Sequence, residues 1–146
     1  MRDDRGVPGP PLPPHARPGL LLLVMVGGVA GALLRYGLTA ALPQHGLPTT
    51  TLGINISGAL LLGVLMQVLA GRPDVGRRRA VRLAIGSGLL GAFTTYSTLA
   101  VEAVLLVRQG DAPLAVAYGV LSVFAGLVAA ALGIALGTVL TVRRPA

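Results

Sequence analysis

The sequence GAFTTYSTLAVE, residues 91–102, places five hydroxyl side chains in a row inside a long apolar run, residues 81–107. The five are Thr94, Thr95, Tyr96, Ser97 and Thr98. A run of this length is typical of a transmembrane helix, where each hydroxyl needs a hydrogen-bond partner because water is absent. Three glycines, Gly86, Gly88 and Gly91, come just before the row. Glycines followed by hydroxyl residues favour a broken helix over a continuous one.

A broken helix in a membrane is a typical ion site. Unwound backbone persists at membrane depth only where protein or a polar cavity surrounds it. Carbonyl groups of such breaks hold cations, and N–H groups hold anions. The alternative is that the hydroxyls bond back to their own helix, which explains one or two such residues more easily than five. The row therefore predicts a polar cavity and an ion site beside the break.

The composition is that of a membrane protein. The chain has 146 residues, of which 53% are hydrophobic and 12% are charged, whereas a soluble domain carries about 25% charged residues. The 21 glycines let transmembrane helices approach closely. The absence of cysteine excludes disulfides and thiolate chemistry. His15 and His45 are expected in the tail and a loop, and we do not expect them to bind a metal.

Four apolar runs have about the 20 residues that a bilayer core requires. They span approximately residues 19–42, 49–70, 81–107 and 114–142. Residues 1–18 are rich in proline and read as a disordered tail, and residues 143–146 form a short basic C-terminus. The remaining prolines fall outside the runs, where proline is tolerated. We therefore expect an all-α membrane protein of four transmembrane helices, with a break in the third.

The positive charges predict how the chain is oriented. The net charge is +7, but the arginines lie at the edges of apolar runs, so we expect contacts with lipid head groups and no nucleic-acid partner. In a four-span chain, the tail, the second loop and the C-terminus share one side of the membrane. Ten arginines fall on that side: Arg2, Arg5, Arg17, Arg72, Arg77, Arg78, Arg79, Arg82, Arg143 and Arg144. The opposite loops carry only Arg108, which predicts that both termini are cytoplasmic in the cell membrane.

Polar residues within the spans are the other candidates. Arg35 and Glu102 are ionisable, and each is either a structural partner or a charge at a functional site. Asn55 either bonds to a neighbouring helix or donates its amide to an anion. Tyr118 and Ser122 are four residues apart and therefore share one helix face.

Three segments resemble the signature segments of the bacterial fluoride channels, called Fluc or CrcB. They are GGVAGALLRY (27–36), TLGINISGALLLG (51–63) and GLLGAFTTYSTLAVE (88–102). The resemblance covers the whole four-helix region and implies a passive channel subunit, not an enzyme, that exports fluoride and protects the cell from it. It also implies an antiparallel dimer with two pores and a sodium ion at its centre.

The resemblance assigns roles to individual residues. The sodium ion would be bound by the backbone carbonyl groups of Gly91 and Thr94. Arg35 and Glu102 match charged positions of the family motifs. The fluoride pore would be lined by Asn55, Thr95, Tyr96, Ser97, Thr98, Leu99, Tyr118 and Ser122. Hydroxyl and amide donors replace the water of a small anion, and without rings of strongly binding charge they also release it.

The chain departs from the family at two aromatic positions. The family pattern after the break is Thr-Thr-Phe-Ser-Thr-Phe, whereas this chain has Tyr96 and Leu99 in place of the phenylalanines. The positive edge of a phenyl ring can meet an anion. Tyr96 retains a ring and Leu99 does not, so we expect the pore that receives Leu99 to conduct poorly or not at all.

The arginine distribution bears on the partner. An antiparallel homodimer needs one sequence to insert in both orientations, and a strong bias opposes this. We therefore expect a heterodimer with an oppositely oriented homologue, with a homodimer as the alternative. A different class, a small four-helix proton-coupled drug exporter, needs an acidic residue in the first helix, where the only charge is Arg35. A purely structural membrane subunit is the third interpretation.

Overall fold

The structure, a computed structural model, describes residues 17–42, 46–71 and 73–142. In these ranges it is an all-helical bundle with four helical segments long and apolar enough to cross a membrane, as the sequence predicted. The three uninterrupted spans are α1 (Pro18–Ala41), α2 (Thr49–Leu69) and α6 (Ala112–Val142). The predicted tail, apart from its last residues, and the basic C-terminus lie outside the described residues.

The remaining span is assembled from four pieces. They are α3 (Gly76–Val81), the π-helical η2 (Arg82–Leu90), α4 (Gly91–Phe93) and α5 (Tyr96–Arg108). Helical geometry stops at Thr94 and Thr95, whose backbones are extended at φ −74°, ψ 153° and φ −147°, ψ 123°. The third span begins at Gly76, whereas the apolar run in the sequence begins near residue 81. The run excludes the charged arginines of α3, but these arginines are part of the helix. The break lies at two threonines, and not at the glycines before them.

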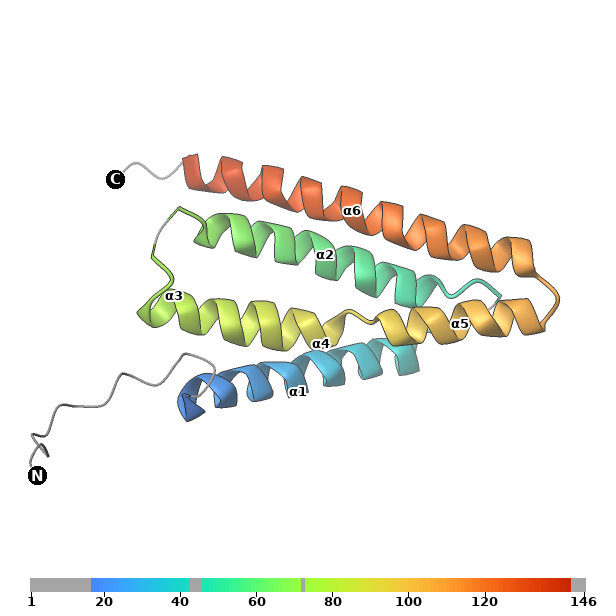
Figure 1. Ribbon diagram of the computed structural model, residues 1–146, viewed down its shortest axis with the longest axis horizontal. Helices are drawn as coiled ribbons and strands as arrows, with labels where there is room; N and C mark the ends of the chain where they lie inside the picture. The colour runs from blue at the N-terminus through green and yellow to red at the C-terminus, as the bar shows by residue number, and fades with distance from the viewer. Residues whose placement is uncertain (1–16, 43–45, 72, 143–146) are drawn as a thin grey trace, which may run out of the picture.

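The third span changes neighbours at its break. Before the break, η2 and α4 pack against α1, and after it, α5 packs against α6. Helix α2 lies along α6 and also contacts η2 (Figure 1). The start of α1, the piece α3 and the end of α6 all lie at one end of the bundle, as an even number of spans requires.

Glycines allow the helix backbones to touch. A Cβ atom added to Gly27 would collide with the carbonyl oxygen of Ala84, and one added to Gly31 would collide with that of Leu89. These contacts join α1 to η2 along one stripe of small residues. The pair α2 and α6 meets in the same way, through Gly63 and Gly133. Close backbone contact of this kind supplies the packing that lipid cannot drive by hydrophobicity.

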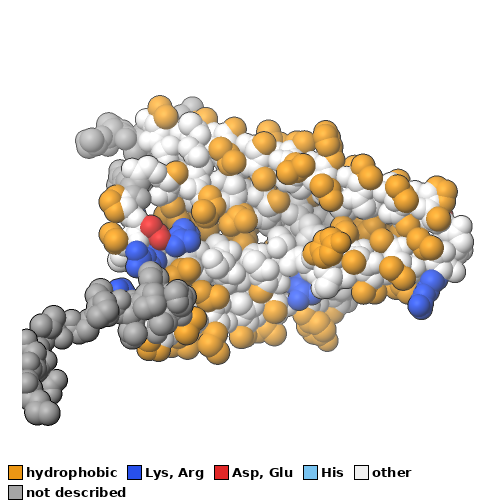
Figure 2. Space-filling view, in the orientation of Figure 1, with side chains coloured by type: hydrophobic (Ala, Val, Ile, Leu, Met, Phe, Trp, Pro, Cys, Tyr) orange, Lys and Arg blue, Asp and Glu red, His pale blue; other side chains and the backbone are white. Residues whose placement is uncertain are grey.

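The outer surface of the bundle is apolar. Met25, Val120 and Phe124 are each more than 60% exposed. Figure 2 shows hydrophobic side chains along the length of one face, with basic side chains gathered near α3. A small buried cluster of Leu106, Ala115 and Tyr118 lies between α5 and α6. Such a surface fits lipid or a second subunit.

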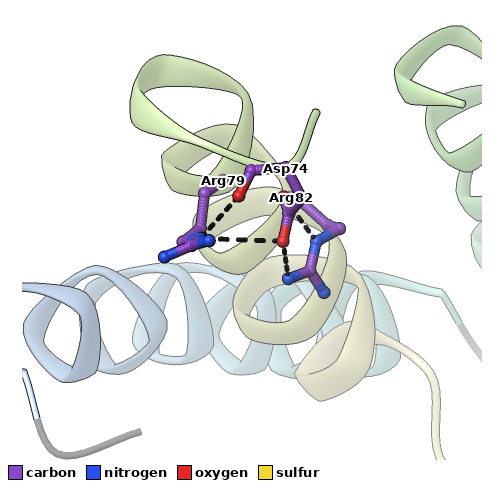
Figure 3. Close-up of polar contacts among 3 residues, drawn as sticks. All are labelled: Asp74, Arg79 and Arg82. Atoms are coloured by element: carbon purple, nitrogen blue, oxygen red, sulfur yellow. Dashed lines mark hydrogen bonds and ion pairs between the residues drawn. The ribbon is translucent and has the colours of Figure 1, made fainter. Parts of the chain in front are cut away.

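Asp74 bonds to two arginines, Arg79 and Arg82, at the beginning of the third span (Figure 3). Its carbonyl oxygen accepts a hydrogen bond of 2.8 Å from Arg79 Nε, and its carboxylate accepts two from the guanidinium of Arg82. The hydrogen bond from Arg82 lowers the pKa of Asp74 below its usual value. Any stabilisation from this pair is therefore present at neutral pH and is lost as the pH falls through the lowered pKa. The carboxylate is exposed, so we expect that contribution to be small.

Candidate functional site

The unwound backbone at the break is held by Asn55 from α2. Asn55 Nδ2 donates to the carbonyl oxygen of Thr95 at 3.0 Å, and the Thr95 N–H donates to Asn55 Oδ1 at 2.8 Å. One side-chain amide therefore satisfies both backbone polar groups of Thr95, since neither group bonds within a helix. The second N–H of the Asn55 amide has no partner among the described residues.

The hydroxyl row is used first to end one helix and begin the next. Thr94 Oγ1 donates to the carbonyl oxygen of Leu90 at 3.1 Å, closing α4. Thr95 Oγ1 accepts the N–H of Thr98 at 3.1 Å and so caps the N-terminus of α5. It also lies 3.0 Å from Thr98 Oγ1 and 3.2 Å from the hydroxyl of Ser97. Hydrogen bonds to nearby backbone and hydroxyl groups therefore account for part of the hydroxyl row, which is the alternative to an ion site given in the sequence analysis.

Among the carbonyl groups that the break releases from their helical donors are those of Gly91 and Thr94. In a continuous helix the Gly91 carbonyl would accept from the Thr95 N–H, which here donates to Asn55. The Thr94 carbonyl would accept from the Thr98 N–H, which here donates to Thr95 Oγ1. Unwound carbonyl groups of this kind coordinate Na⁺ in transporters. The donor set therefore fits a sodium ion, and no cluster of three or more His, Cys, Asp or Glu that could hold a metal occurs in the described part of the chain.

Arg35 brings α1 to the same break. Its Nε donates to the carbonyl oxygen of Ala92 at 3.1 Å, and the side chain is half-buried. The sequence identified Arg35 as a charge inside the first span but gave no partner for it. The structure makes it the partner of a carbonyl group whose helical donor would be the Tyr96 N–H. The guanidinium also adds positive potential beside the break, which favours an anion nearby.

A groove of about 310 Å³ collects six of the predicted site residues. They are Asn55, Thr94, Thr95, Tyr96, Leu99 and Ser122. Tyr96 is 81% exposed at the rim, and Ser97 and Thr98 are not among the lining residues. Three helical spans therefore contribute to one polar groove at the break.

Gly58 is a residue of this groove that the sequence analysis did not assign. A Cβ atom there would collide with the methyl group of Thr94, so only glycine lets the broken backbone approach α2 this closely. A signal for it existed, because Gly58 lies three residues after Asn55 and therefore on the same helix face.

Glu102 forms a second polar cluster, which connects three helices. Thr51 Oγ1 and the Tyr118 hydroxyl each donate to its carboxylate, both at 2.7 Å. Thr51 and Tyr118 are each only 1% exposed. Ser122 Oγ donates to the Tyr118 carbonyl oxygen at 2.7 Å and also lines the groove. Ser122 therefore lies between the groove and the Glu102 cluster.

Comparison with known proteins identifies relatives of this chain. Residues 22–134 match the model of the family described as "CrcB-like protein, Camphor Resistance (CrcB)". A protein of Cutibacterium acnes, "Fluoride-specific ion channel FluC 1", is 49% identical over 113 residues, covering 75% of this chain and 79% of the relative. "Fluoride-specific ion channel FluC 2" of Leifsonia xyli subsp. xyli is 42% identical, covering 90% of this chain and 92% of the relative. "Fluoride-specific ion channel FluC" of Pseudomonas fluorescens is 41% identical, covering 80% and 95%.

Proposed function

The chain belongs to the CrcB family, and from that membership we propose that it is a subunit of a fluoride-selective channel that exports fluoride passively from the cell. The observation that carries the proposal is the polar groove at the helix break, which gathers amide and hydroxyl groups from three spans. The family is one of ion channels rather than enzymes. The drug-exporter interpretation has no support in these relatives.

In this proposal the groove takes over the hydration of the anion. The second N–H of Asn55 is a fixed donor, and the hydroxyl hydrogens of Thr94, Thr95 and Ser122 rotate to exchange partners. Arg35 raises the local concentration of anions without lining the groove. Because none of the lining residues is a cation, fluoride is held weakly enough to leave again.

A sodium ion at the break belongs to the same proposal. The carbonyl oxygens of Gly91 and Thr94 would hold it, since their usual helical donors are engaged elsewhere. The ion would supply a fixed positive charge next to the anion path. Asn55 and Arg35 hold the neighbouring backbone in the shape that leaves these two carbonyl groups available.

We further propose that the partner is an oppositely oriented homologous subunit, with both termini of this chain in the cytoplasm. The ten arginines on one side and Arg108 on the other support one fixed orientation. A bias of this strength opposes the mixed insertion that an antiparallel homodimer needs.

Fluoride efflux from liposomes, read with a fluoride electrode, tests both the proposed channel function and the proposed heterodimer. Rapid fluoride efflux with chloride retained is expected when this chain is reconstituted with an oppositely oriented homologue, and little efflux is expected from the chain alone. Efflux from the chain alone would keep the function but contradict the heterodimer. Absence of efflux in both preparations, with folded protein present, would overturn the proposed function.

Leu99→Phe is expected to raise fluoride throughput about threefold, which corresponds to roughly 0.6 kcal/mol in the barrier, because the positive edge of a phenyl ring can meet an anion. Leu99 lines the groove beside Asn55, so a ring at this position would meet an anion there. Leu99→Met, of similar volume but without a ring, is the matched control and should leave the efflux rate unchanged. Equal rates for Leu99→Phe and the unmodified chain would contradict the prediction.

A further inference from the structure

A pocket at the arginine-rich end of the bundle is not explained by ion conduction. It has a volume of about 780 Å³ and lies between the ends of α2 and α6 and the piece α3. Its walls are of two kinds. Val68, Leu69, Val81 and Leu140 supply apolar side chains, and Arg77 and Arg78 supply charge. The groove at the break shares none of these residues.

Arg78 is the unusual member of this pocket. Its Nη1 atom is buried and has no hydrogen-bond partner among the described residues. By contrast, Arg79 and Arg82 of the same segment are both bonded to Asp74 (Figure 3). A buried guanidinium nitrogen without an acceptor is costly, so an oxygen-bearing anion that entered the pocket and reached this group would satisfy it.

We propose that this pocket binds one anionic glycerophospholipid. The guanidinium groups of Arg77 and Arg78 bond to the head-group phosphate, a pairing for which the planar arginine fork is well shaped. An acyl chain lies along the apolar wall and continues past Leu140, which is 55% exposed on α6. An arginine pair beside an apolar wall at the end of a membrane bundle fits a lipid, whereas a free phosphate would leave that wall uncovered.

The chain contains no tryptophan, so the fluorescence of a single introduced tryptophan can report lipid binding at its position. Leu140→Trp places one at the pocket wall, and quenching by bromine-labelled phosphatidylglycerol is compared with quenching by bromine-labelled phosphatidylcholine. We expect about tenfold tighter binding of phosphatidylglycerol at this position, since each arginine near a lipid surface contributes severalfold. Leu127→Trp, at a 65% exposed position farther along α6, is the control and should be quenched equally by both lipids.

Two double substitutions on the Leu140→Trp background test which arginines cause the preference for phosphatidylglycerol. Arg77→Gln with Arg78→Gln should abolish the preference for phosphatidylglycerol. Arg79→Gln with Arg82→Gln removes the same charge from the same segment and should keep it. Equal quenching by the two lipids at Leu140→Trp would overturn the proposal, even if the first pair fails to fold. Relief of the quenching by inorganic phosphate would also overturn it, because the site would then bind free anions.

Discussion

Asn55→Leu is expected to abolish fluoride efflux and to lower the free energy of unfolding by about 2–5 kcal/mol, because two half-buried backbone groups lose their partners. Asn55 alone bonds to both the N–H and the carbonyl group of Thr95. Leucine has the same branched arrangement of heavy atoms as asparagine, so the main loss is of hydrogen bonds. Efflux assays on liposomes and unfolding in detergent measure the two effects.

Ser57→Ala is the matched control for Asn55→Leu. Ser57 lies on the same helix but bonds only to the carbonyl oxygens of Gly53 and Ile54 within it. Its removal should change the free energy of unfolding by less than about 0.5 kcal/mol and leave efflux intact. Asn55→Asp adds a second comparison, because it keeps the acceptor for the Thr95 N–H and replaces the amide donor with negative charge. Normal efflux from Asn55→Leu would show that the amide is dispensable.

Gly27→Ala is expected to destabilise the bundle by about 2–3 kcal/mol, because overpacking against rigid backbone is costly. The added methyl group would meet the carbonyl oxygen of Ala84, which is part of a helix and cannot rotate away. Helix α1 would be pushed off η2, and the Arg35 bond to Ala92 would weaken with it. Lower efflux should accompany the loss of stability.

The neighbouring Gly28 provides the control for Gly27→Ala. Apart from the adjoining backbone of α1 itself, no atom of the described residues lies within 4 Å of a Cβ atom built on Gly28, so alanine fits there without displacement. Alanine also favours a helix over glycine, by about 1 kcal/mol in water. Gly28→Ala should therefore be neutral or slightly stabilising in detergent. Equal unfolding midpoints for the two variants would contradict the close contact between α1 and η2.

Local patterns predicted much of the fold but only part of the site. The four spans follow from run length, and the break follows from the hydroxyl row, because both signals lie within neighbouring residues. The hydrogen-bond partners of the polar side chains, by contrast, could not be predicted from neighbouring residues. Thr51, Glu102 and Tyr118 are far apart in the sequence, and only the packing of three helices brings them together.

The position of the break shows the same limit. Gly88, one of the three glycines before the hydroxyl row, is used for packing, since a Cβ atom there would lie 2.7 Å from the carbonyl oxygen of Val24. The helix instead opens at Thr94 and Thr95, where Asn55 supplies hydrogen bonds from another helix. The sodium role of the Gly91 and Thr94 carbonyl groups stays a prediction.

The two side chains that stabilise the break have a consequence for how the protein is made. Arg35 and Asn55 both precede the broken span in the sequence, so the ribosome delivers them first. When Thr94 and Thr95 enter the bilayer, partners for the exposed peptide groups are therefore already present in α1 and α2. Unwound backbone without such partners would be expelled from lipid or forced into a helix. The order of residues along the chain is thus suited to membrane insertion as well as to the finished structure.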